Sequence, residues 1–285
     1  MMDLLHLDRD NALAYCHHAP ARDGAPSFVF VNALTGSTAH WETEIAPALR
    51  QAGFGTLSYN FRGQSESPFT PGTALTPALI VADLTALMDR LRPARPILVG
   101  LSIGGLFAAQ AIAAGADAGP DAGADAGADA EALVLLNTLR EIGPRIAWIN
   151  DALPALVGHG GVALFMDAIL PLLVNPEFAA SARGAALAGH YAPLAPDHGH
   201  MNLMQHASAA DWDFPWHELA LPVLNITGLH DRVFLDRDVL DRLYATLPDA
   251  RCEIWADAGH LLPLERPAKL ARSLEKFGAE IEARR

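Results

Sequence analysis

Short apolar runs alternate with longer segments of helical periodicity along most of this 285-residue chain. Two of the runs, Ser27–Asn32 and Ile97–Leu101, are almost continuously apolar, as strands buried on both faces of a sheet require. A chain that alternates in this way builds βαβ units on a mainly parallel sheet. The pattern therefore predicts an α/β fold in which helices flank the sheet.

The same patterns predict the individual elements. The first two strands flank an Arg9-Asp10-Asn11 turn and should form a hairpin. Thr76 is placed to cap the helix that it precedes, and Pro77 suits the first turn of that helix. The expected strands are Leu4–Asp8, Ala12–His18, Ser27–Asn32, Phe54–Asn60, Ile97–Leu101, Ala132–Asn137, Val223–Thr227 and Cys252–Ala256. The expected helices are His40–Gln51, Thr76–Leu91, Gly104–Ala114, Asp236–Leu247 and Pro267–Ile281.

The alternation stops between Arg140 and Leu219, where helix-forming residues are interrupted by Pro and Gly. We expect this segment to form a helical cap over the sheet. Residues 1–139 and 220–285 would then form the core, and residues 140–219 the cap. The length, which permits one large domain or two small ones, would correspond to one core with its cap.

Residues 114–129 repeat an Ala-Gly-Ala-Asp pattern with a period of four, with one Ala replaced by Pro. Without residues 118–129 the chain would have an ordinary helix-to-strand connection. We therefore expect residues 115–130 to form a low-complexity surface loop that arose by tandem expansion. A calcium-binding repeat is the alternative, but such repeats have a period of nine and a bulky apolar residue in each repeat.

Composition limits the partners and the compartment. The 33 acidic residues outnumber the 20 Lys and Arg, giving a net charge of −13, and nucleic acid or anionic membranes require clustered cations. Cys16 and Cys252 are too few for the disulfide framework of a secreted domain. The N-terminal MMDLLHLDRD is acidic where a signal peptide is basic, and no apolar stretch of ~18 residues is uninterrupted. We expect a cytoplasmic protein that binds neither nucleic acid nor membrane.

The strongest motif is GLSIGG at residues 100–105, in which Ser102 lies between a predicted strand and a predicted helix. In that context a GxSxG pattern holds the serine in strained backbone geometry with its Oγ exposed. The glycines leave room where strand and helix approach each other, and the helix N-terminus favours negative charge beside the serine. Ser102 is therefore the predicted nucleophile. The alternative is a Gly-rich turn without chemistry.

A serine needs a neighbouring base to take its proton. His260 follows the last predicted strand, in AGHLLPLERP, and Asp231 follows the strand before it, in GLHD. Both loops reach the C-terminal edge of the sheet, where Asp231 can orient His260 and stabilise its imidazolium form. Glu141, which follows another strand, is an alternative acid. Asp257 is expected only to cap a loop.

These segments resemble the α/β-hydrolase superfamily over essentially the whole chain. The resemblance is carried by VGLSIGGLFAAQ, ITGLHDRVF and AGHLLPLERP, together with YNFRGQSES after strand Phe54–Asn60. The chain order of Ser102, Asp231 and His260 is that of the superfamily. The resemblance implies a mostly parallel eight-stranded sheet, a cap and a Ser-His-Asp triad, and nothing in it implies a cofactor.

An oxyanion hole is expected from two backbone N–H groups. One belongs to Ile103 and the other to Leu34, with Ala33 as second choice, in the loop after strand Ser27–Asn32. Many relatives have His-Gly where this chain has Asn-Ala. The Asn-x-Leu pattern followed by Gly and Trp, GLSIGG and LVLLNTLREIGPRIAW are similar to the 3-oxoadipate enol-lactonases. The segment ALTGS also resembles homoserine acetyltransferases, which are longer chains.

The resemblance to enol-lactonases implies a substrate with a free carboxylate and hence a cation in the pocket. The arginines available in the cap segment are Arg140, Arg145 and Arg183. If all three faced bulk solvent, a generic esterase would remain. The residues expected to line the substrate pocket are Trp148, Phe165, Met166 and Arg145.

A metal site is not predicted. The cap contains His190, His198, His200 and His206. Without a nearby Cys or a helical His-x-x-x-His pair, these histidines are expected to be polar loop residues. The segment His159-Gly160-Gly161 has the composition of an oxyanion motif, but it follows the nucleophile and is expected to connect two helices.

The leading hypothesis is a serine hydrolase that cleaves a small to medium carboxylic ester or lactone through an acyl-enzyme. Ser102 would attack the carbonyl, His260 would transfer the proton, and water would release the acyl group. One alternative is an acyltransferase, in which the apolar cap shields the acyl-enzyme from water. Another is a slow receptor-hydrolase that retains its ligand. The partner in each case is a small molecule, and the sequence leaves the oligomeric state open.

Overall fold

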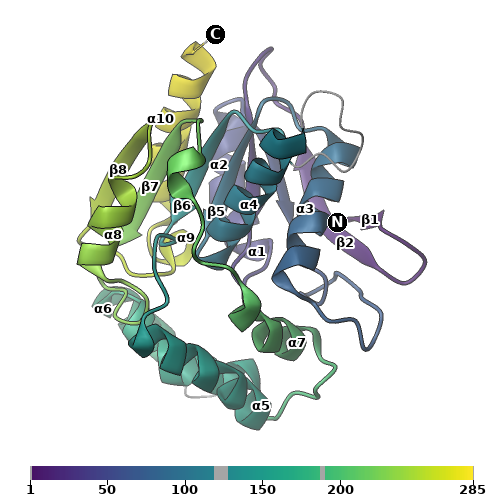
Figure 1. Ribbon diagram of the computed structural model, residues 1–285, viewed down its shortest axis with the longest axis vertical. Coiled ribbons are helices and arrows are strands. Elements are labelled where there is room, and N and C mark those ends of the chain that lie inside the picture. The colour runs from purple at the N-terminus through teal and green to yellow at the C-terminus, as the bar shows by residue number, and fades with distance from the viewer. Residues whose placement is uncertain (1, 119–127, 187–189, 285) are drawn as a thin grey trace.

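The computed structural model describes residues 2–118, 128–186 and 190–284. Its strands are β1 (Asp3–His6), β2 (Ala12–His18), β3 (Ser27–Val31), β4 (Gly55–Tyr59), β5 (Pro96–Leu101), β6 (Ala132–Leu136), β7 (Val223–Gly228) and β8 (Ala250–Trp255). Within this part of the chain they form one eight-stranded sheet in the order β1-β2-β4-β3-β5-β6-β7-β8 (Figure 1). β2 pairs antiparallel with β1 and with β4, and the remaining pairs are parallel. The predicted fold is confirmed.

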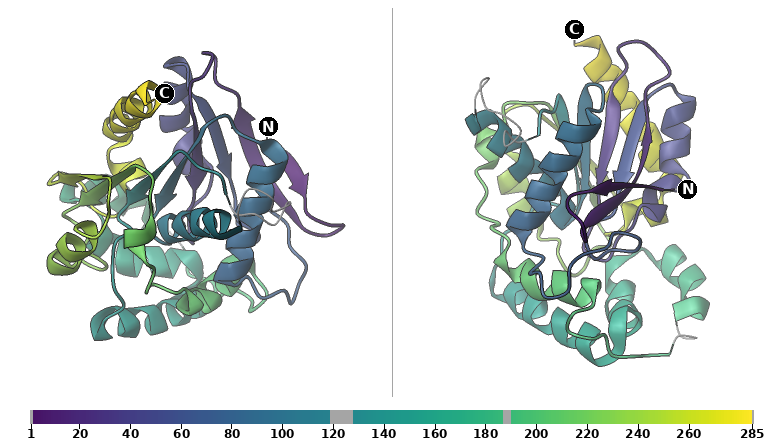
Figure 2. Two further views of the ribbon diagram at one scale, coloured as in Figure 1. Left: turned by 45° about the horizontal axis from the view of Figure 1, so that its top comes forward. Right: turned by 90° about the vertical axis from the view of Figure 1, so that its right-hand side faces the viewer.

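Helices cover both faces of the sheet. The core helices are α1 (Ala39–Glu42), α2 (Ile45–Gln51), α3 (Pro77–Leu91), α4 (Ile103–Ala118), α8 (Arg237–Tyr244), α9 (Leu262–Glu265) and α10 (Pro267–Ala283). Because side chains alternate across a strand, Val29 and Val31 of β3 lie in one core with α3 and α4. Phe28 and Phe30 lie in a second core with α2 and α10. Figure 2 shows the two pairs of helices on opposite faces.

Most element boundaries follow the predictions closely. Thr76 caps α3, because its side chain accepts the N–H of Leu79 (3.3 Å), and Pro77 begins the helix as expected. The single helix expected over residues 40–51 is instead two short helices, α1 and α2. α4 continues to Ala118, so residues 115–118 of the expected low-complexity loop are helical. Residues 119–127 of that loop lie outside the described residues, and residues 128–130 lead into β6.

Three helices lie between β6 and β7, at the C-terminal edge of the sheet (Figure 1). They are α5 (Pro144–Leu173), α6 (Pro176–Ala186) and α7 (Gly199–His206), followed by short 3-10 turns at Ala207–Ala209 and Trp216–Glu218. They occupy the segment in which the helical cap was expected. α5 is kinked at Gly161, where φ is +70°, so the expected turn in His159-Gly160-Gly161 is a break within one helix.

By length and composition alone, α5 is the one described helix that could span a membrane, with a mean hydropathy of 1.7 over its most apolar window. In the fold this helix packs against α6 and α7 instead. Its apolar residues contribute to two small hydrophobic clusters, which include Val157 and Phe165 in one and Leu170 and Leu173 in the other. Packing in the cap therefore involves part of this helix, since 28% of its most apolar window is buried.

Candidate active site

Ser102 occupies the turn between β5 and α4 in a left-handed backbone conformation, with φ at +58°. The turn is so tight that positions 104 and 105, which follow it, require glycine. A Cβ on Gly104 would lie 2.4 Å from the backbone oxygen of Asn32, and one on Gly105 would lie 2.0 Å from Thr138 Oγ1. Backbone strain at a non-glycine residue is characteristic of functional sites. The geometry is the strand-to-helix turn that the GxSxG pattern predicts.

Asp231 and His260 are joined by a hydrogen bond at the same edge of the sheet. His260 Nδ1 donates to Asp231 Oδ2 over 2.6 Å, and both residues are buried. The other carboxylate oxygen, Oδ1, accepts the N–H groups of Val233 (3.0 Å) and Phe234 (2.9 Å). Burial by itself raises the pKa of Asp231, but His260, the N–H group of Phe234 and the charge of Arg140 together hold that pKa below its usual value. The acid therefore stays ionised and fixes the imidazole.

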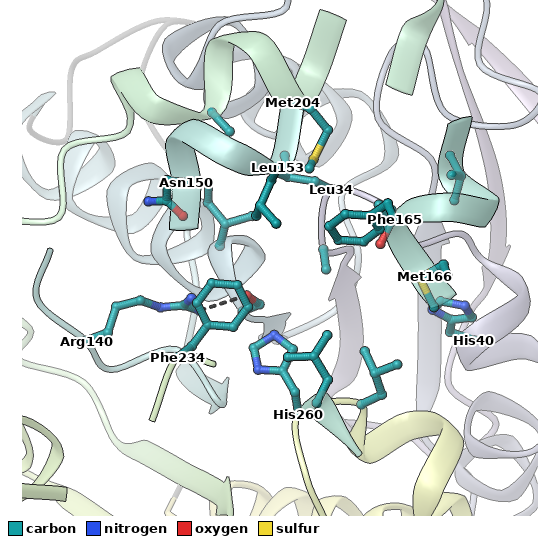
Figure 3. A pocket seen from close by; sticks show the side chains of 18 of the residues that line it. Leu34, His40, Arg140, Asn150, Leu153, Phe165, Met166, Met204, Phe234 and His260 are labelled. Atoms are coloured by element: carbon teal, nitrogen blue, oxygen red, sulfur yellow. Dashed lines mark hydrogen bonds between the residues drawn. The ribbon is translucent and has the colours of Figure 1, made fainter. Parts of the chain in front are cut away.

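Ser102 and His260 line one cavity of about 260 Å³ beneath α5 and α7 (Figure 3). Most of its wall is apolar, and the cap contributes Leu153, Phe165 and Met204. The predicted pocket residues Phe165 and Met166 both line it. His40, which the sequence did not single out, also lines it, and burial lowers the pKa of His40 below its usual value. A lone histidine on a short helix carries no sequence signal.

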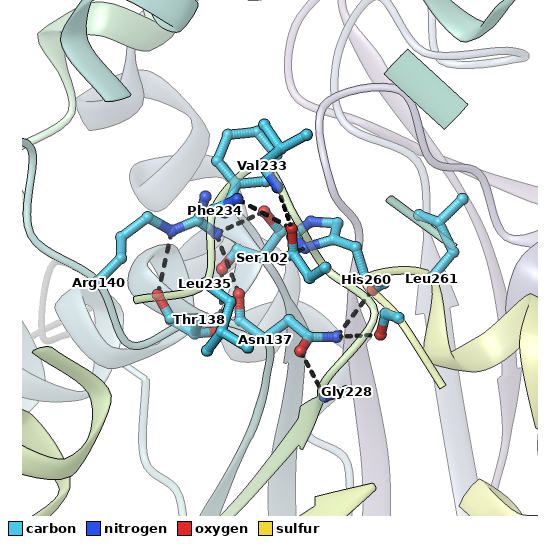
Figure 4. Close-up of polar contacts among 12 residues, drawn as sticks. Ser102, Asn137, Thr138, Arg140, Gly228, Val233, Phe234, Leu235, His260 and Leu261 are labelled. Carbon is cyan, nitrogen blue, oxygen red and sulfur yellow. Dashed lines mark hydrogen bonds and ion pairs between the residues drawn. The ribbon is translucent and has the colours of Figure 1, made fainter. Parts of the chain in front are cut away.

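Arg140 contacts the predicted nucleophile, Ser102, directly. Its Nη2 donates to Ser102 Oγ over 2.7 Å and to the backbone oxygen of Asn137 over 3.1 Å, while Nε donates to the backbone oxygen of Thr138 over 3.2 Å (Figure 4). Arg140 is only 4% exposed, and burial lowers its pKa to about 10. In the described structure no hydrogen bond joins Ser102 to His260.

The N–H groups of Leu34 and Ile103, predicted to form the oxyanion hole, make no hydrogen bond to any residue that the structure describes. Both residues line the cavity beside Ser102. The loop that contains Leu34 is fixed by the buried Gln64, whose Nε2 donates to the oxygens of Ala33 (2.8 Å) and Leu34 (2.9 Å). In a trans peptide the Ala33 oxygen points opposite to the Leu34 N–H. Gln64 therefore fixes the direction of that N–H group.

Asn32, which departs from the His-Gly of many relatives, is a buried structural residue. Its Oδ1 accepts the indole N–H of Trp41 (2.7 Å), and its Nδ2 donates to the backbone oxygen of Tyr59 (2.9 Å) and to Gln64 Oε1 (3.1 Å). These bonds connect β3 to the loop after β4. Asn32 thus holds Gln64 in place, and Gln64 in turn fixes the loop that contains Leu34.

Two further buried residues position the loops of Asp231 and His260. Asn137 accepts the N–H of Gly228 with Oδ1 (2.9 Å), and its Nδ2 donates to the backbone oxygens of Gly259 (3.0 Å) and His260 (2.9 Å). It therefore links the acid-bearing loop to the histidine-bearing loop (Figure 4).

Glu265 fixes both sides of His260. Its carboxylate accepts the N–H groups of Gly259 (2.8 Å) and Leu261 (3.0 Å), and also the backbone and side-chain N–H groups of Asn175 (2.7 and 2.8 Å). Asn175 lies between α5 and α6, so this carboxylate connects the cap to the loop of His260. No sequence pattern indicates this role, because it depends on residues 90 positions apart.

The end of α5 also contacts both loops. The backbone oxygen of Leu172 accepts the N–H of Arg232 (2.8 Å), and that of Leu173 accepts the N–H of His260. Asp231 and His260 are thereby each flanked by a hydrogen bond to the last turn of this helix. The last turn of α5 therefore links the cap to the Asp231 loop and to the His260 loop.

Two of the predicted pocket residues lie elsewhere. Trp148 is 80% exposed, because it lies on the outer face of α5, and the prediction that it lines the pocket is wrong. Arg145 also lies outside the cavity, because its Nη1 donates to the backbone oxygen of Val233 (2.6 Å). Arg140 lines the cavity, so the cation implied by the enol-lactonase resemblance is present.

The other candidate residues are accounted for by surface contacts. Glu141, the alternative acid, is exposed and pairs with Arg242 (2.7 Å), far from a catalytic arrangement with His260. Asp257 pairs with Arg266 (3.1 Å) and Lys269 (2.7 Å) at the surface. Among the described residues there is no group of His, Cys, Asp or Glu that could hold a metal ion.

Comparison with known proteins agrees with this architecture. A family model described as the alpha/beta hydrolase fold matches residues 26–267. RutD of Variovorax paradoxus, a candidate carbamate hydrolase, is 26% identical over 95% of this chain and 97% of its own. The enol-lactonase from Burkholderia xenovorans LB400 is 25% identical and superposes with a TM-score of 0.71, covering 94% of this chain and 96% of its own. A thermophilic esterase from Thermogutta terrifontis has a TM-score of 0.77 at 18% identity, with 99% of each chain covered. The chain belongs to the alpha/beta hydrolase fold family.

Proposed function

We propose that this enzyme hydrolyses a small to medium carboxylic ester or lactone through an acyl-enzyme on Ser102. The observation that supports the proposal most directly is the buried Asp231–His260 hydrogen bond at 2.6 Å, in the cavity into which the strained turn presents Ser102. The similarity to an enol-lactonase and to an esterase agrees with this chemistry.

In the proposed mechanism Ser102 Oγ forms a bond to the carbonyl carbon while His260 takes the serine proton. The N–H groups of Leu34 and Ile103 bind the oxyanion that develops. Collapse of the intermediate breaks the ester bond, and His260 returns the proton to the leaving alkoxide. Water, activated by the same histidine, then releases the acid. Asp231 orients His260 throughout and stabilises its imidazolium form.

The test is hydrolysis of p-nitrophenyl acetate together with covalent labelling by a fluorophosphonate. The wild-type protein should turn over the ester and should be labelled on Ser102. The Ser102→Ala variant should do neither, while its thermal denaturation stays close to that of the wild type. Unchanged turnover by Ser102→Ala would remove the proposal. Transfer of the acyl group to an added alcohol in preference to water would assign the same acyl-enzyme to an acyltransferase.

A further inference from the structure

The hydrogen bond between Arg140 and Ser102 leaves the serine proton free to move. A guanidinium has only donors, so Ser102 Oγ is the acceptor of the 2.7 Å bond from Arg140 Nη2 (Figure 4). The hydroxyl hydrogen takes no part in that bond. His260 Nδ1 donates to Asp231, so the other ring nitrogen, Nε2, is the one with a lone pair to accept a proton. Arg140 and His260 can therefore act on Ser102 together, one as a donor to Oγ and the other as its base.

The guanidinium is anchored independently of the serine side chain. Nε donates to the backbone oxygen of Thr138 (3.2 Å), and Nη2 also donates to that of Asn137 (3.1 Å). Thr138 in addition donates through Oγ1 to the backbone oxygen of Ser102 (2.9 Å). The segment after β6 thus holds both the cation and the turn of the serine. Nη2 stays beside Oγ whether Oγ is a good acceptor, as in a hydroxyl, or a poor one, as in an ester.

The surroundings of Arg140 keep it charged. Burial lowers the pKa of Arg140, the opposite charge of Asp231 raises it, and the resulting value of about 10 leaves the side chain protonated at neutral pH. The rings of Trp212 and Phe234 both lie 4.5 Å from Arg140 Cζ. The centroid of the Phe234 ring also lies 5.0 Å from that of His260. Asp231 is therefore the opposite charge for Arg140 and also for His260 once that ring has taken a proton.

The oxygen of Ser102 becomes negative at two points of the proposed reaction. It does so first when His260 takes its proton and Oγ forms a bond to the carbonyl carbon. It does so again when the bond between the acyl carbon and Oγ breaks and the electron pair returns to Oγ. The N–H groups of Leu34 and Ile103 bind the carbonyl oxygen instead, so they do not act on this charge. A fixed cation that donates to Oγ stabilises both transition states more than the neutral hydroxyl.

We propose that Arg140 is a further catalytic residue, which stabilises the negative charge on Ser102 Oγ while the acyl-enzyme forms and while it is hydrolysed. The inference rests on the proposed function, because it concerns the same nucleophile. The reacting proton moves between Ser102, His260, the leaving group and water, and Arg140 keeps its own protons throughout. The effect of Arg140 is on the nucleophile, so it should not depend on the charge of the substrate.

The test is the rate of labelling by an uncharged fluorophosphonate, in which Oγ of Ser102 forms a bond to phosphorus and fluoride leaves. Arg140→Met removes the charge and the donors, and it should be labelled about 10- to 100-fold more slowly, the range for a hydrogen bond to a charged group. Arg140→Lys keeps a cation and should recover part of the rate. The control Arg183→Met removes an exposed cap charge outside the cavity and should react at the wild-type rate. Turnover of p-nitrophenyl acetate should follow the same order.

A second measurement separates the charge of Arg140 from its shape. Arg140→Ala leaves space between Trp212 and Phe234, which a free guanidinium ion can enter. Guanidinium at a concentration that does not denature the protein should raise the labelling rate of this variant. Urea has nearly the same planar shape but no charge, and at the same concentration it should not. Neither compound should accelerate Arg140→Met, because the longer side chain fills the space. Thermal denaturation of each variant establishes that it is folded.

Two results would overturn the inference. One is labelling of Arg140→Met at the wild-type rate or faster, because Arg140 would then have no effect on the nucleophile or would restrain it. Arg140→Gln, which is neutral, replaces this variant if the methionine variant does not fold. The other is equal rescue of Arg140→Ala by guanidinium and urea, because a packing role would explain that result. A wild-type protein that is neither labelled nor active on p-nitrophenyl acetate would instead refute the proposed function itself.

Discussion

Glu265 provides the sharpest test of how His260 is held in place. Its carboxylate accepts four N–H groups, three on Oε2 and one on Oε1, from Asn175, Gly259 and Leu261. Glu265→Gln keeps the shape of the side chain but removes its charge. If the amide oxygen occupies the position of Oε2, its NH₂ group faces the N–H of Leu261. Three charged hydrogen bonds become neutral, and one buried donor loses its acceptor.

The expected loss of stability follows from these four contacts. A hydrogen bond to a charged group contributes about 1 kcal/mol more than a neutral one, and an unsatisfied buried donor costs about 1–3 kcal/mol. The free energy of unfolding should therefore fall by about 4–6 kcal/mol, measured by urea denaturation. Because the two N–H groups flank His260, kcat on p-nitrophenyl acetate should fall at least about tenfold under folding conditions.

The matched control is Glu177→Gln. Glu177 pairs with Arg266 over 2.7 Å, but its side chain is 78% exposed, and exposed pairs contribute about 0–1 kcal/mol. Its urea midpoint and kcat should remain close to those of the wild type. If Glu265→Gln behaved like this control, the carboxylate would not hold the His260 loop, and the reasoning would be wrong.

Two other outcomes are expected. Gln64→Glu replaces the donor to the Leu34 loop with a carboxylate that repels two backbone oxygens, so kcat should fall with little change in KM; a rise in KM as large as the fall in kcat would contradict this. Gly105→Ala, which places a Cβ 2.0 Å from Thr138 Oγ1, should destabilise the protein by about 1–3 kcal/mol in thermal denaturation.

The sequence was sufficient to predict the fold because its signals are local. Continuous apolar runs identify buried parallel strands, and β2 spans Ala12–His18 as expected. Thr76-Pro77 identifies the start of α3. The break between α1 and α2 was missed, since both short helices share one apolar pattern. Helix periodicity does not indicate where a chain changes direction.

The site was predictable only in part. Ser102, Asp231 and His260 each follow a strand, so topology brings them to one edge of the sheet, and their roles stay a prediction. Trp148 was misplaced because an aromatic residue on a cap helix can face either side, and one sequence does not reveal the partner surface. The contact between Arg140 and Ser102 depends on the path of the chain after β6, which no local pattern specifies.

The last turn of α5 has a consequence for engineering. The backbone oxygens of Leu172 and Leu173 accept the N–H groups of Arg232, which follows Asp231, and of His260. A cap exchanged from a relative must therefore reproduce this turn in position, or it will disturb catalysis even if the new pocket accepts the substrate. The first half of α5, before the kink at Gly161, makes no backbone hydrogen bond to either loop in the described structure, but the Arg145 side chain in its first turn donates to the backbone oxygen of Val233 (2.6 Å). Grafts that change substrate range should therefore be joined between Arg145 and Gly161, so that Arg145 and the C-terminal half of α5 are both kept.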